Sequence, residues 1–334
     1  MAAKPRVFVT RLIPEAGLSQ IRAVCEAEVW PEQLPPPYEV LRDRVRHCDG
    51  LVSLLTDTID AALLDAAPQL KVVSNFAVGF NNIDVKAATD RGIAVGNTPG
   101  VLTDATADMA FCLLIAAARR IVEGHRYSIE GRWKTWEPLG HLGQDLFGKT
   151  LGVVGMGRIG YALARRCARG WDMKVLYHDV YRHEAAEREL GAVSCDLETL
   201  LRQSDFVSVH TDLNPSTRGL FNLERFKLMK PTAVFVNTAR GPIVVQKDLC
   251  QALKSGIIFA AGLDVTDPEP PTPDDELLRL PNVIVAPHIA SATVGTRNAM
   301  ADICARNLIA GLTGQPLPHP VNPEVEPRRR RTAV

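Results

Sequence analysis

Three glycines and one aspartate have the spacing that a dinucleotide site requires. The apolar run at 151–154 leads into Gly155-Met-Gly157-Arg-Ile-Gly160, and a helical pattern follows. In such a motif the first glycine permits a tight turn, the second lets the backbone approach a pyrophosphate, and the third lets helix and strand pack closely. The helix N-terminus offers N–H groups to the phosphates. Asp179 ends the next strand, about 20 residues further on, where a carboxylate binds an adenosine ribose.

Arg240, Glu269 and His288 each lie shortly after an apolar strand in the same half of the chain. We expect them to lie together, because open α/β sheets bind ligands beyond the carboxyl ends of their strands. An arginine binds a carboxylate with two hydrogen bonds, and a histidine can pass a proton to a carbonyl oxygen near neutral pH. A neighbouring glutamate would raise the pKa of His288 and orient its ring. These residue types suit chemistry on a 2-oxo acid.

Each of the three residues also has an ordinary structural interpretation. Arg240 could form an ion pair at a strand end, Glu269 could be solvated in its proline-rich loop, and His288 could cap a helix or fill a core. The dinucleotide motif upstream of all three favours the catalytic interpretation.

The elements that must position these residues alternate between strands and helices. The first part of the chain has apolar runs at 7–10, 28–30, 50–55, 70–75 and 93–97. A second series of six strands is expected at 151–154, 174–178, 206–210, 233–237, 259–263 and 283–286. This rhythm predicts an α/β protein with two doubly wound parallel-sheet domains, a flavodoxin-like substrate domain and a Rossmann dinucleotide-binding domain.

Two helical patterns bear on the domain organisation. A long helix over 103–123 is apolar on most faces, so we expect it to be buried against more than one partner. The last helix, over 294–310, is expected to return to the first domain. The predicted substrate-binding domain is therefore discontinuous, with residues 1–103 and 290–334, and residues 104–289 form the dinucleotide-binding domain.

The composition excludes several classes of function. Lys+Arg and Asp+Glu balance at 38 each, so no strong field favours nucleic acid or a membrane surface. The seven cysteines show no metal-ligand spacing, which indicates reduced thiols and no metal site. The N-terminus lacks an apolar signal region, so we expect a cytoplasmic protein. The basic run Arg328–Arg331 is expected to be a solvated, mobile terminus.

The chain resembles the D-isomer-specific 2-hydroxyacid dehydrogenases over nearly its whole length, and within that family the glyoxylate reductase / hydroxypyruvate reductase branch. The residues that carry the resemblance lie in segments 75–84, 97–108, 155–160, 237–241, 262–265 and 287–291. The resemblance implies that hydride from NADH reaches the carbonyl carbon of glyoxylate or hydroxypyruvate. It also implies that protonated His288 gives its proton to the oxygen, which yields the D-2-hydroxy acid, and that domain closure excludes water.

The resemblance also implies a set of site residues. Arg240 and His288 would be catalytic, with Glu269 as the partner of His288, and the N–H groups of Val78 and Gly79 would hold the substrate carboxylate with Arg240. Further substrate contacts are expected from three side chains: Leu55, Trp136 and Ser291. Cofactor contacts are expected from ten residues: Thr106, Gly155, Gly157, Arg158, Ile159, Gly160, Asp179, Thr217, Thr238 and Asp264.

Asp179 decides the expected cofactor, because a carboxylate binds ribose hydroxyls and repels the 2′-phosphate of NADPH. We therefore expect NAD, with NADH preferred over NADPH, although Arg182 could partly rescue NADPH binding. Many members of the resembling family have proline at the position of Asp212, close to where an adenine could lie. The details of the adenine contact are therefore expected to differ in this chain. A tryptophan near Trp136 reaches the partner subunit's active site in the resembling branch, so we expect a homodimer.

Two other functions have to be weighed against a reductase. A NAD-sensing corepressor or scaffold can share this fold and even the Arg/Glu/His trio, but the balanced charge argues against it. A short 3-phosphoglycerate dehydrogenase would need basic groups for the phosphate, and the loop at 78–81 offers none. Formate dehydrogenase-like chemistry is disfavoured by Glu269, since those relatives use Gln.

Overall fold

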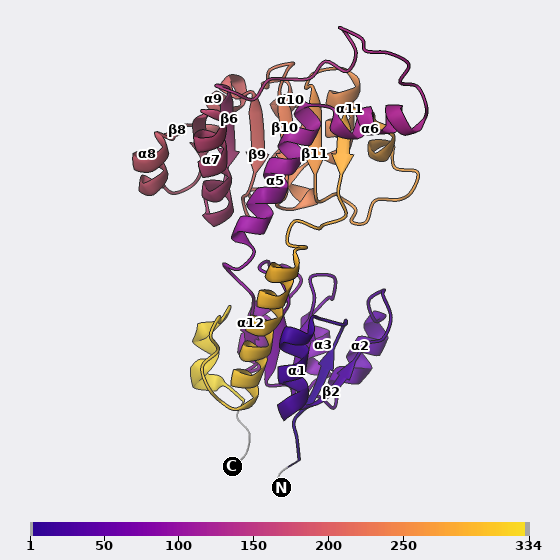
Figure 1. Ribbon diagram of the computed structural model, residues 1–334. Helices are drawn as coiled ribbons and strands as arrows, with labels where there is room; N and C mark the ends of the chain where they lie inside the picture. The colour runs from indigo at the N-terminus through magenta and orange to yellow at the C-terminus, as the bar shows by residue number, and fades with distance from the viewer. Residues whose placement is uncertain (1–2, 331–334) are drawn as a thin grey trace. The chain divides into compact units, whose positions relative to one another are not determined.

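The computed structural model describes residues 3–330, which form two compact units. The first unit holds the residues up to 102 together with those from 292 onward, and the second unit holds residues 103–291. Each unit contains one sheet in which every strand pairing is parallel (Figure 1). The predicted fold class, two doubly wound parallel-sheet domains, is confirmed.

The first unit has a five-stranded sheet of order β2-β1-β3-β4-β5, which is the flavodoxin-like order. Its strands are β1 (Arg6–Val9), β2 (Glu26–Val29), β3 (Gly50–Ser53), β4 (Val72–Asn75) and β5 (Ala94–Gly96). Its α-helices are α1 (Glu15–Val24), α2 (Tyr38–Val45), α3 (Ala61–Asp65), α4 (Val85–Asp90) and α12 (Val294–Leu312).

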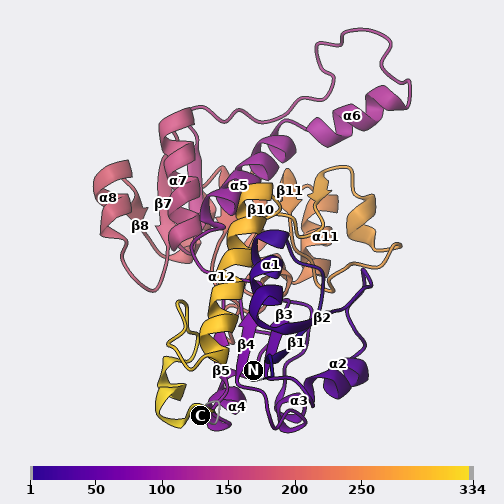
Figure 2. The same ribbon diagram turned by 60° about the horizontal axis from the view of Figure 1, so that its bottom comes forward.

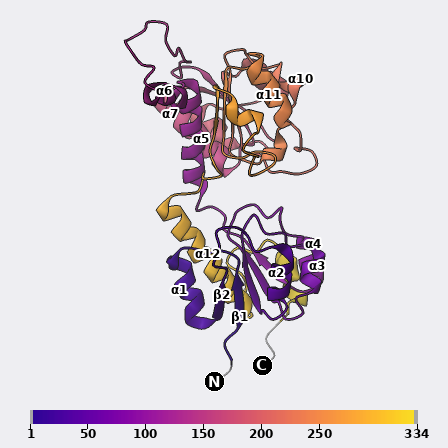
Figure 3. The same ribbon diagram turned by 90° about the vertical axis from the view of Figure 1, so that its right-hand side faces the viewer.

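Both faces of this sheet are covered because its strands are apolar on both sides. Val7 and Val9 of β1 pack with α1 and α12, whereas Phe8 between them packs with α2, α3 and α4. Figures 2 and 3 show α1 and α12 side by side on one face. The last helix of the chain thus completes the core of the first unit.

The described residues of the second unit form a seven-stranded sheet of order β12-β11-β10-β9-β6-β7-β8. Its strands are β6 (Thr150–Val154), β7 (Lys174–His178), β8 (Val193–Ser194), β9 (Phe206–Val209), β10 (Val234–Asn237), β11 (Ala260–Leu263) and β12 (Val283–Val285). The short β8 was not predicted. Strand order reverses between β6 and β9, and open α/β sheets bind their ligands beyond the carboxyl ends of the strands at such a point.

Helices cover both faces of the second sheet (Figure 3). They are α5 (Thr103–Ala118), α6 (Ile121–Ile129), α7 (Arg158–Trp171), α8 (Glu184–Leu190), α9 (Leu197–Gln203), α10 (Leu223–Phe226) and α11 (Gln246–Lys254). Helices α5 and α7 pack on one face with Leu151 and Val153, and α9, α10 and α11 pack on the other with Val207 and Phe235.

The single helix predicted over 103–123 is wrong, because the chain breaks between α5 and α6. Arg120 has a left-handed backbone with φ of 52°, which a regular α-helix cannot contain. Its guanidinium donates to both carboxylate oxygens of Glu123, at 2.8 and 2.7 Å. This bidentate pair holds the break in place.

The predicted solvated, mobile terminus is wrong for Arg329 and Arg330, whereas Arg328 is exposed. The side chain of Arg329 is buried and donates to two carbonyl oxygens at and just after the end of α12. Arg330 donates to three carbonyl oxygens in the segment 67–70. Chain ends and helix ends leave carbonyl acceptors without partners, and guanidinium groups satisfy them here. Arg331 lies outside the described residues.

Residues 3–330 include no helix that is long and apolar enough to cross a bilayer. Within the same residues, no three His, Cys, Asp or Glu side chains are grouped so that they could hold a metal ion. All seven cysteines are unpaired.

The contact between α1 and α12 gives a test of the packing of the first unit. A Cβ atom at Gly17 would lie 2.1 Å from the carbonyl oxygen of Ala301, so Gly17→Ala forces the helices apart. We expect it to lower the free energy of unfolding by about 1–3 kcal/mol in urea denaturation, despite the better helix propensity of alanine. Gly124→Ala in α6 is the control, because no other atom lies within 4 Å of a Cβ there. Equal effects at both positions would contradict this packing.

Candidate active site

The glycine turn after β6 is built by close approach of backbone atoms. Gly155 has φ of +93°, and a Cβ there would lie 2.6 Å from the amide nitrogen of Thr211. A Cβ at Gly160 would lie 2.2 Å from the carbonyl oxygen of Gly155. Gly157, in contrast, has no described atom within 4 Å of its Cβ position. The turn therefore leaves an open cradle at the N-terminus of α7, where backbone N–H groups suit a phosphate.

Asp179 is fixed beside this turn by the backbone. Its carboxylate accepts hydrogen bonds from the N–H groups of Met156, at 2.7 Å, and Tyr181, at 3.3 Å. An ionised carboxylate has about four lone-pair positions, so two amides leave capacity for ribose hydroxyls. Arg158 and Ile159, also predicted as cofactor contacts, are the first two residues of α7.

The three predicted cofactor threonines have different surroundings. The Oγ1 atom of Thr238 is buried and has no hydrogen-bond partner among the described residues. A buried hydroxyl without a partner is costly, so this atom fits a site that a ligand completes. Thr217 instead serves its own loop, since its hydroxyl donates to the carbonyl oxygen of Asp212 at 2.6 Å. Thr106 is buried in the first turn of α5.

Arg240 follows β10 in a turn that two contacts define. Asn237, the last residue of β10, donates to the carbonyl oxygen of Arg240 at 2.9 Å. A Cβ at Gly241 would lie 1.8 Å from the carbonyl oxygen of Thr266, so this turn packs against the segment that leads to Glu269. Burial lowers the pKa of Arg240, and the charge of Glu269 opposes that shift. A guanidinium keeps its charge in such surroundings, so it can bind a carboxylate.

His288 and Glu269 form a close pair, with Nδ1 and Oε1 2.5 Å apart. This contact leaves Nε2 as the ring nitrogen that can face a substrate. The backbone of His288 is left-handed, with φ of 54°, a conformation that costs energy and is found at functional sites. The ring is therefore held by a strained turn as well as by its carboxylate partner.

Asp264 holds that strained turn. Its carbonyl oxygen accepts from the N–H of His288 at 3.0 Å. Its carboxylate accepts from the N–H groups of Ile289, at 2.8 Å, and Ala290, at 2.7 Å. Burial raises the pKa of Asp264, although both amides and the charge of His288 act in the opposite direction. The structure thus gives Asp264, predicted as a cofactor contact, a role in positioning His288.

In the first unit, the loop after β4 carries the predicted carboxylate donors, the N–H groups of Val78 and Gly79. The carbonyl oxygen of Ala77 accepts from the N–H of Thr98 at 2.9 Å, and that of Val78 accepts from Nδ2 of Asn97 at 2.7 Å. In a trans peptide the N–H points away from the C=O of the same peptide group. These two hydrogen bonds therefore fix the directions of both donors.

The loop that carries Leu55, after β3, is tied to the loop after β4. Nδ2 of Asn82 donates to the carbonyl oxygens of Leu54 and Asp57, at 3.0 Å each. The buried carboxylate of Asp57 accepts from the N–H of Leu54 at 2.7 Å. Leu55 itself is 36% exposed. Sequence reasoning missed Asn82, Asn97 and Asp57 as positioning residues; the available signal was polar side chains at or just beyond strand ends.

The structure gathers the predicted trio at one edge of the second sheet. Arg240, Glu269 and His288 follow β10, β11 and β12 respectively, and Ser291 lies three residues beyond His288. Leu55, Val78 and Gly79 belong to the first unit. Trp136 lies in the segment after α6, and its side chain is 80% exposed.

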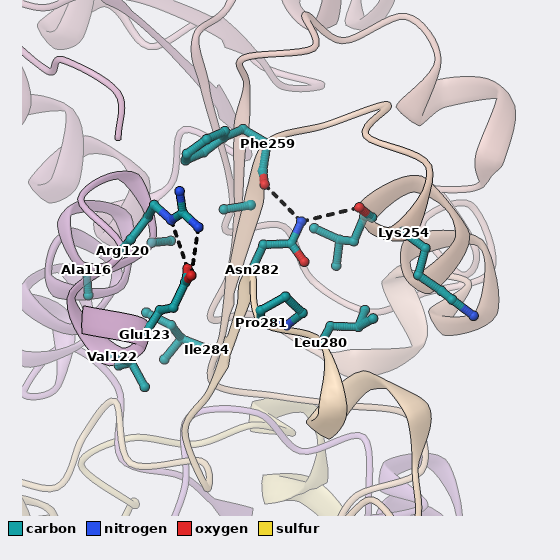
Figure 4. Close-up of a pocket in the computed structure, with 13 residues that line it drawn as sticks. Ala116, Arg120, Val122, Glu123, Lys254, Phe259, Leu280, Pro281, Asn282 and Ile284 are labelled. Atoms are coloured by element: carbon teal, nitrogen blue, oxygen red, sulfur yellow. Dashed lines mark hydrogen bonds and ion pairs between the residues drawn. The ribbon is translucent and has the colours of Figure 1, made fainter. Parts of the chain in front are cut away.

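A separate hollow of about 530 Å³ lies at the opposite edge of the second sheet (Figure 4). It is lined by Phe259 and Asn282, which precede β11 and β12, and by the ion pair of Arg120 and Glu123. It is distinct from the trio, which lies beyond the carboxyl ends of the same strands.

A Rossmann sheet with a glycine turn, an aspartate beside that turn and an Arg/Glu/His trio at its strand ends defines a nicotinamide-dinucleotide-dependent dehydrogenase. The chain belongs to the D-isomer specific 2-hydroxyacid dehydrogenase family. The model of that family's NAD binding domain matches residues 111–290.

Two relatives are similar over nearly their whole length. The glyoxylate reductase of Korarchaeum cryptofilum is 55% identical over 323 residues, which cover 96% of this chain and 97% of the relative. The glyoxylate reductase of Thermococcus kodakarensis is 52% identical over 326 residues, with the same shares of the two chains.

Solved structures agree with this assignment. The TT0316 protein of Thermus thermophilus is 46% identical, with a TM-score of 0.90 over 95% of this chain and 99% of its own. The NADPH-dependent glyoxylate/hydroxypyruvate reductase of Sinorhizobium meliloti, solved with NADP and malonate, is 33% identical. Its TM-score is 0.84 over 99% of this chain and 100% of its own.

The hydrogen bond from Asn97 to the carbonyl oxygen of Val78 gives a test of the positioning role of Asn97. We expect Asn97→Ala to lower kcat/KM for a 2-oxo acid by about 10–100-fold, mainly through KM, because the N–H of Gly79 loses its fixed direction. NADH binding should not change. Asn322→Ala is the matched control, since Asn322 is also a buried asparagine and its side-chain oxygen accepts from the backbone N–H of Val95 at 2.8 Å. If both variants lose stability and neither changes KM, the positioning role is wrong.

Proposed function

We propose that this protein reduces a small 2-oxo acid, glyoxylate and also hydroxypyruvate, to the D-2-hydroxy acid with NADH. The observation that carries the proposal is the His288–Glu269 pair, 2.5 Å apart, which shares a sheet edge with the half-buried Arg240. Relatives of about 50% identity named glyoxylate reductase support the choice of substrate.

In the proposed mechanism, each residue has one task. Arg240 binds the substrate carboxylate together with the N–H groups of Val78 and Gly79, and Leu55 and Ser291 line the substrate site. Reduced nicotinamide, when bound, supplies the hydride. His288 donates the Nε2 proton to the carbonyl oxygen, and Glu269 favours the imidazolium that carries this proton. After transfer the ring is neutral and takes a proton from solvent.

Three features of the second unit fit the dinucleotide. The open cradle at Gly157 suits the pyrophosphate, the buried hydroxyl of Thr238 has an unused hydrogen-bonding capacity, and Asp179 lies beside the turn. The carboxylate of Asp179 favours ribose hydroxyls and repels a 2′-phosphate, so we propose a preference for NADH. The NADPH-dependent relative from Sinorhizobium meliloti indicates that the preference differs within the family.

Initial rates test this proposal. The protein is assayed with glyoxylate, hydroxypyruvate, pyruvate and 3-phosphohydroxypyruvate, each with NADH and with NADPH. We expect the fastest oxidation of NADH with glyoxylate or hydroxypyruvate. His288→Gln should lower kcat by about 10²–10⁴-fold and leave NADH binding unchanged, because only the proton donor is lost.

The other outcomes separate the rival functions. Tight NADH binding without turnover of any acid would support a NAD-sensing corepressor or scaffold. Preference for 3-phosphohydroxypyruvate would indicate a short 3-phosphoglycerate dehydrogenase. Faster rates with NADPH would contradict the role given to Asp179.

We further propose that the protein is a homodimer. Helix α6 has no buried residue, and its last residue and the segment after it expose large apolar side chains: Ile129 by 70%, Trp133 by 68%, Trp136 by 80% and Leu139 by 81%. Large apolar patches on a protein surface mark interaction sites, and a second copy is the commonest partner. Trp136 would then contribute to the partner's substrate site.

The oligomeric state is measured by sedimentation at several protein concentrations. We expect a dimer, and we expect Leu139→Asp to dissociate it, because a charge would be buried in the apolar contact. Leu34→Asp is the control, since Leu34 is 72% exposed in the first unit, away from α6 in the sequence. A wild-type protein that is monomeric at all concentrations would overturn the dimer.

A further inference from the structure

Arg182 lies three residues beyond Asp179, and its guanidinium is bound on two sides by a single carboxylate. Its Nε atom donates to Oε1 of Glu187 at 3.1 Å, and its Nη2 atom donates to Oε2 at 2.6 Å. This is the parallel, two-bond geometry in which guanidinium groups bind carboxylates and phosphates most strongly. The Nε/Nη2 edge of the guanidinium, one of its two-donor faces, is thus already engaged, and its charge is already paired with a carboxylate.

Glu187 is itself held in place by the core. The hydroxyl of Tyr177 donates to Oε1 of Glu187 at 2.6 Å, and Tyr177 is fully buried. The same hydroxyl accepts from the N–H of His183 at 3.0 Å. Pairing with Arg182 lowers the pKa of Glu187, so its carboxylate stays charged at neutral pH. Arg182 therefore binds a fixed acceptor and not a freely rotating surface carboxylate.

This arrangement affects any dinucleotide with a phosphate on its adenosine ribose. In Rossmann folds an arginine close to the ribose-binding position accommodates the 2′-phosphate of NADP. Arg182 has that place in the sequence, but it would have to leave Glu187 before it could offer its Nε/Nη2 edge and an unpaired charge to a phosphate. Asp179 opposes the phosphate by its charge, and Glu187 opposes it by holding the cation that would neutralise the charge.

We propose that Glu187 is a specificity-determining residue that excludes 2′-phosphorylated dinucleotides by holding Arg182. The proposal rests on the dinucleotide site of the proposed function. It adds a second source of exclusion to that of Asp179: Glu187 lies on helix α8, whereas Asp179 directly follows strand β7, and the two act by different physical means. Removal of the Glu187 charge should therefore improve NADPH binding even when Asp179 is intact.

The test uses Glu187→Gln, which keeps the side-chain shape and an acceptor for the Tyr177 hydroxyl. Binding of NADPH and NADH is titrated by the fluorescence of the reduced nicotinamide. We expect the dissociation constant for NADPH to fall about three- to tenfold, since a partly exposed ion pair is worth little more than that. The dissociation constant for NADH should change less than about twofold.

Two further variants identify the cause. Glu189→Gln is the matched control, because Glu189 is a carboxylate on the same helix that binds Tyr161 at 2.5 Å and Arg188 at 3.4 Å. It should leave the preference unchanged. Arg182→Ala in the Glu187→Gln background should abolish the gain in NADPH binding. Adenosine 2′,5′-bisphosphate and AMP, titrated by calorimetry, should repeat the difference without the nicotinamide.

The outcomes separate this proposal from the proposed function. A wild-type protein that binds neither NADH nor NADPH would overturn both. Normal NADH binding with an unchanged preference in Glu187→Gln would overturn the role of Glu187 alone. A gain that persists without Arg182 would also overturn it, because the effect would then be a general loss of negative charge.

Discussion

The candidate active site depends on the three hydrogen bonds that Asp264 accepts around His288. A left-handed backbone costs about 1–3 kcal/mol at a residue other than glycine, so the turn persists only if its surroundings fix it. Asp264 supplies that constraint from the adjacent strand end, with one bond to its carbonyl oxygen and two to its carboxylate. The buried carboxylate is in turn stabilised by the amides that it orders. The same turn carries the ring to within 2.5 Å of Glu269.

At other strand ends, too, a polar side chain holds the backbone of the loop that follows. Asn75 and Asn237 are the last residues of β4 and β10, and Asn97 and Asp264 follow β5 and β11 directly. Where a strand ends, the backbone groups of the next residues lose their ladder partners and need others. These four side chains bind such groups in the loops that carry the predicted site residues. The sheets thus position the site through short polar side chains.

The sequence was sufficient for the fold class and for the trio, because both depend on local signals. Apolar runs mark strands, and the residues that follow them must reach one edge of a parallel sheet. The break at Arg120 had no such signal, since arginine is a good helix former and the break is held by a pairing with Glu123. Arg329 was misjudged for a similar reason. The carbonyl oxygens that accept from Arg329 are brought near it only by the tertiary structure. A run of arginines in the sequence does not indicate that such acceptors will be there.

The hydrogen bonds of the two acidic side chains explain why Glu269, and not Asp264, is the partner of the His288 ring. Both carboxylate oxygens of Asp264 accept from backbone amides, so they order the turn and do not contact the ring nitrogen. Glu269 contacts the ring nitrogen directly and also opposes the burial of Arg240 by its charge. One carboxylate therefore stabilises both cations that the proposed chemistry needs, the proton donor and the carboxylate-binding group. Replacing Glu269 with an amide would keep a contact to the ring but remove the one negative charge that acts on both His288 and Arg240.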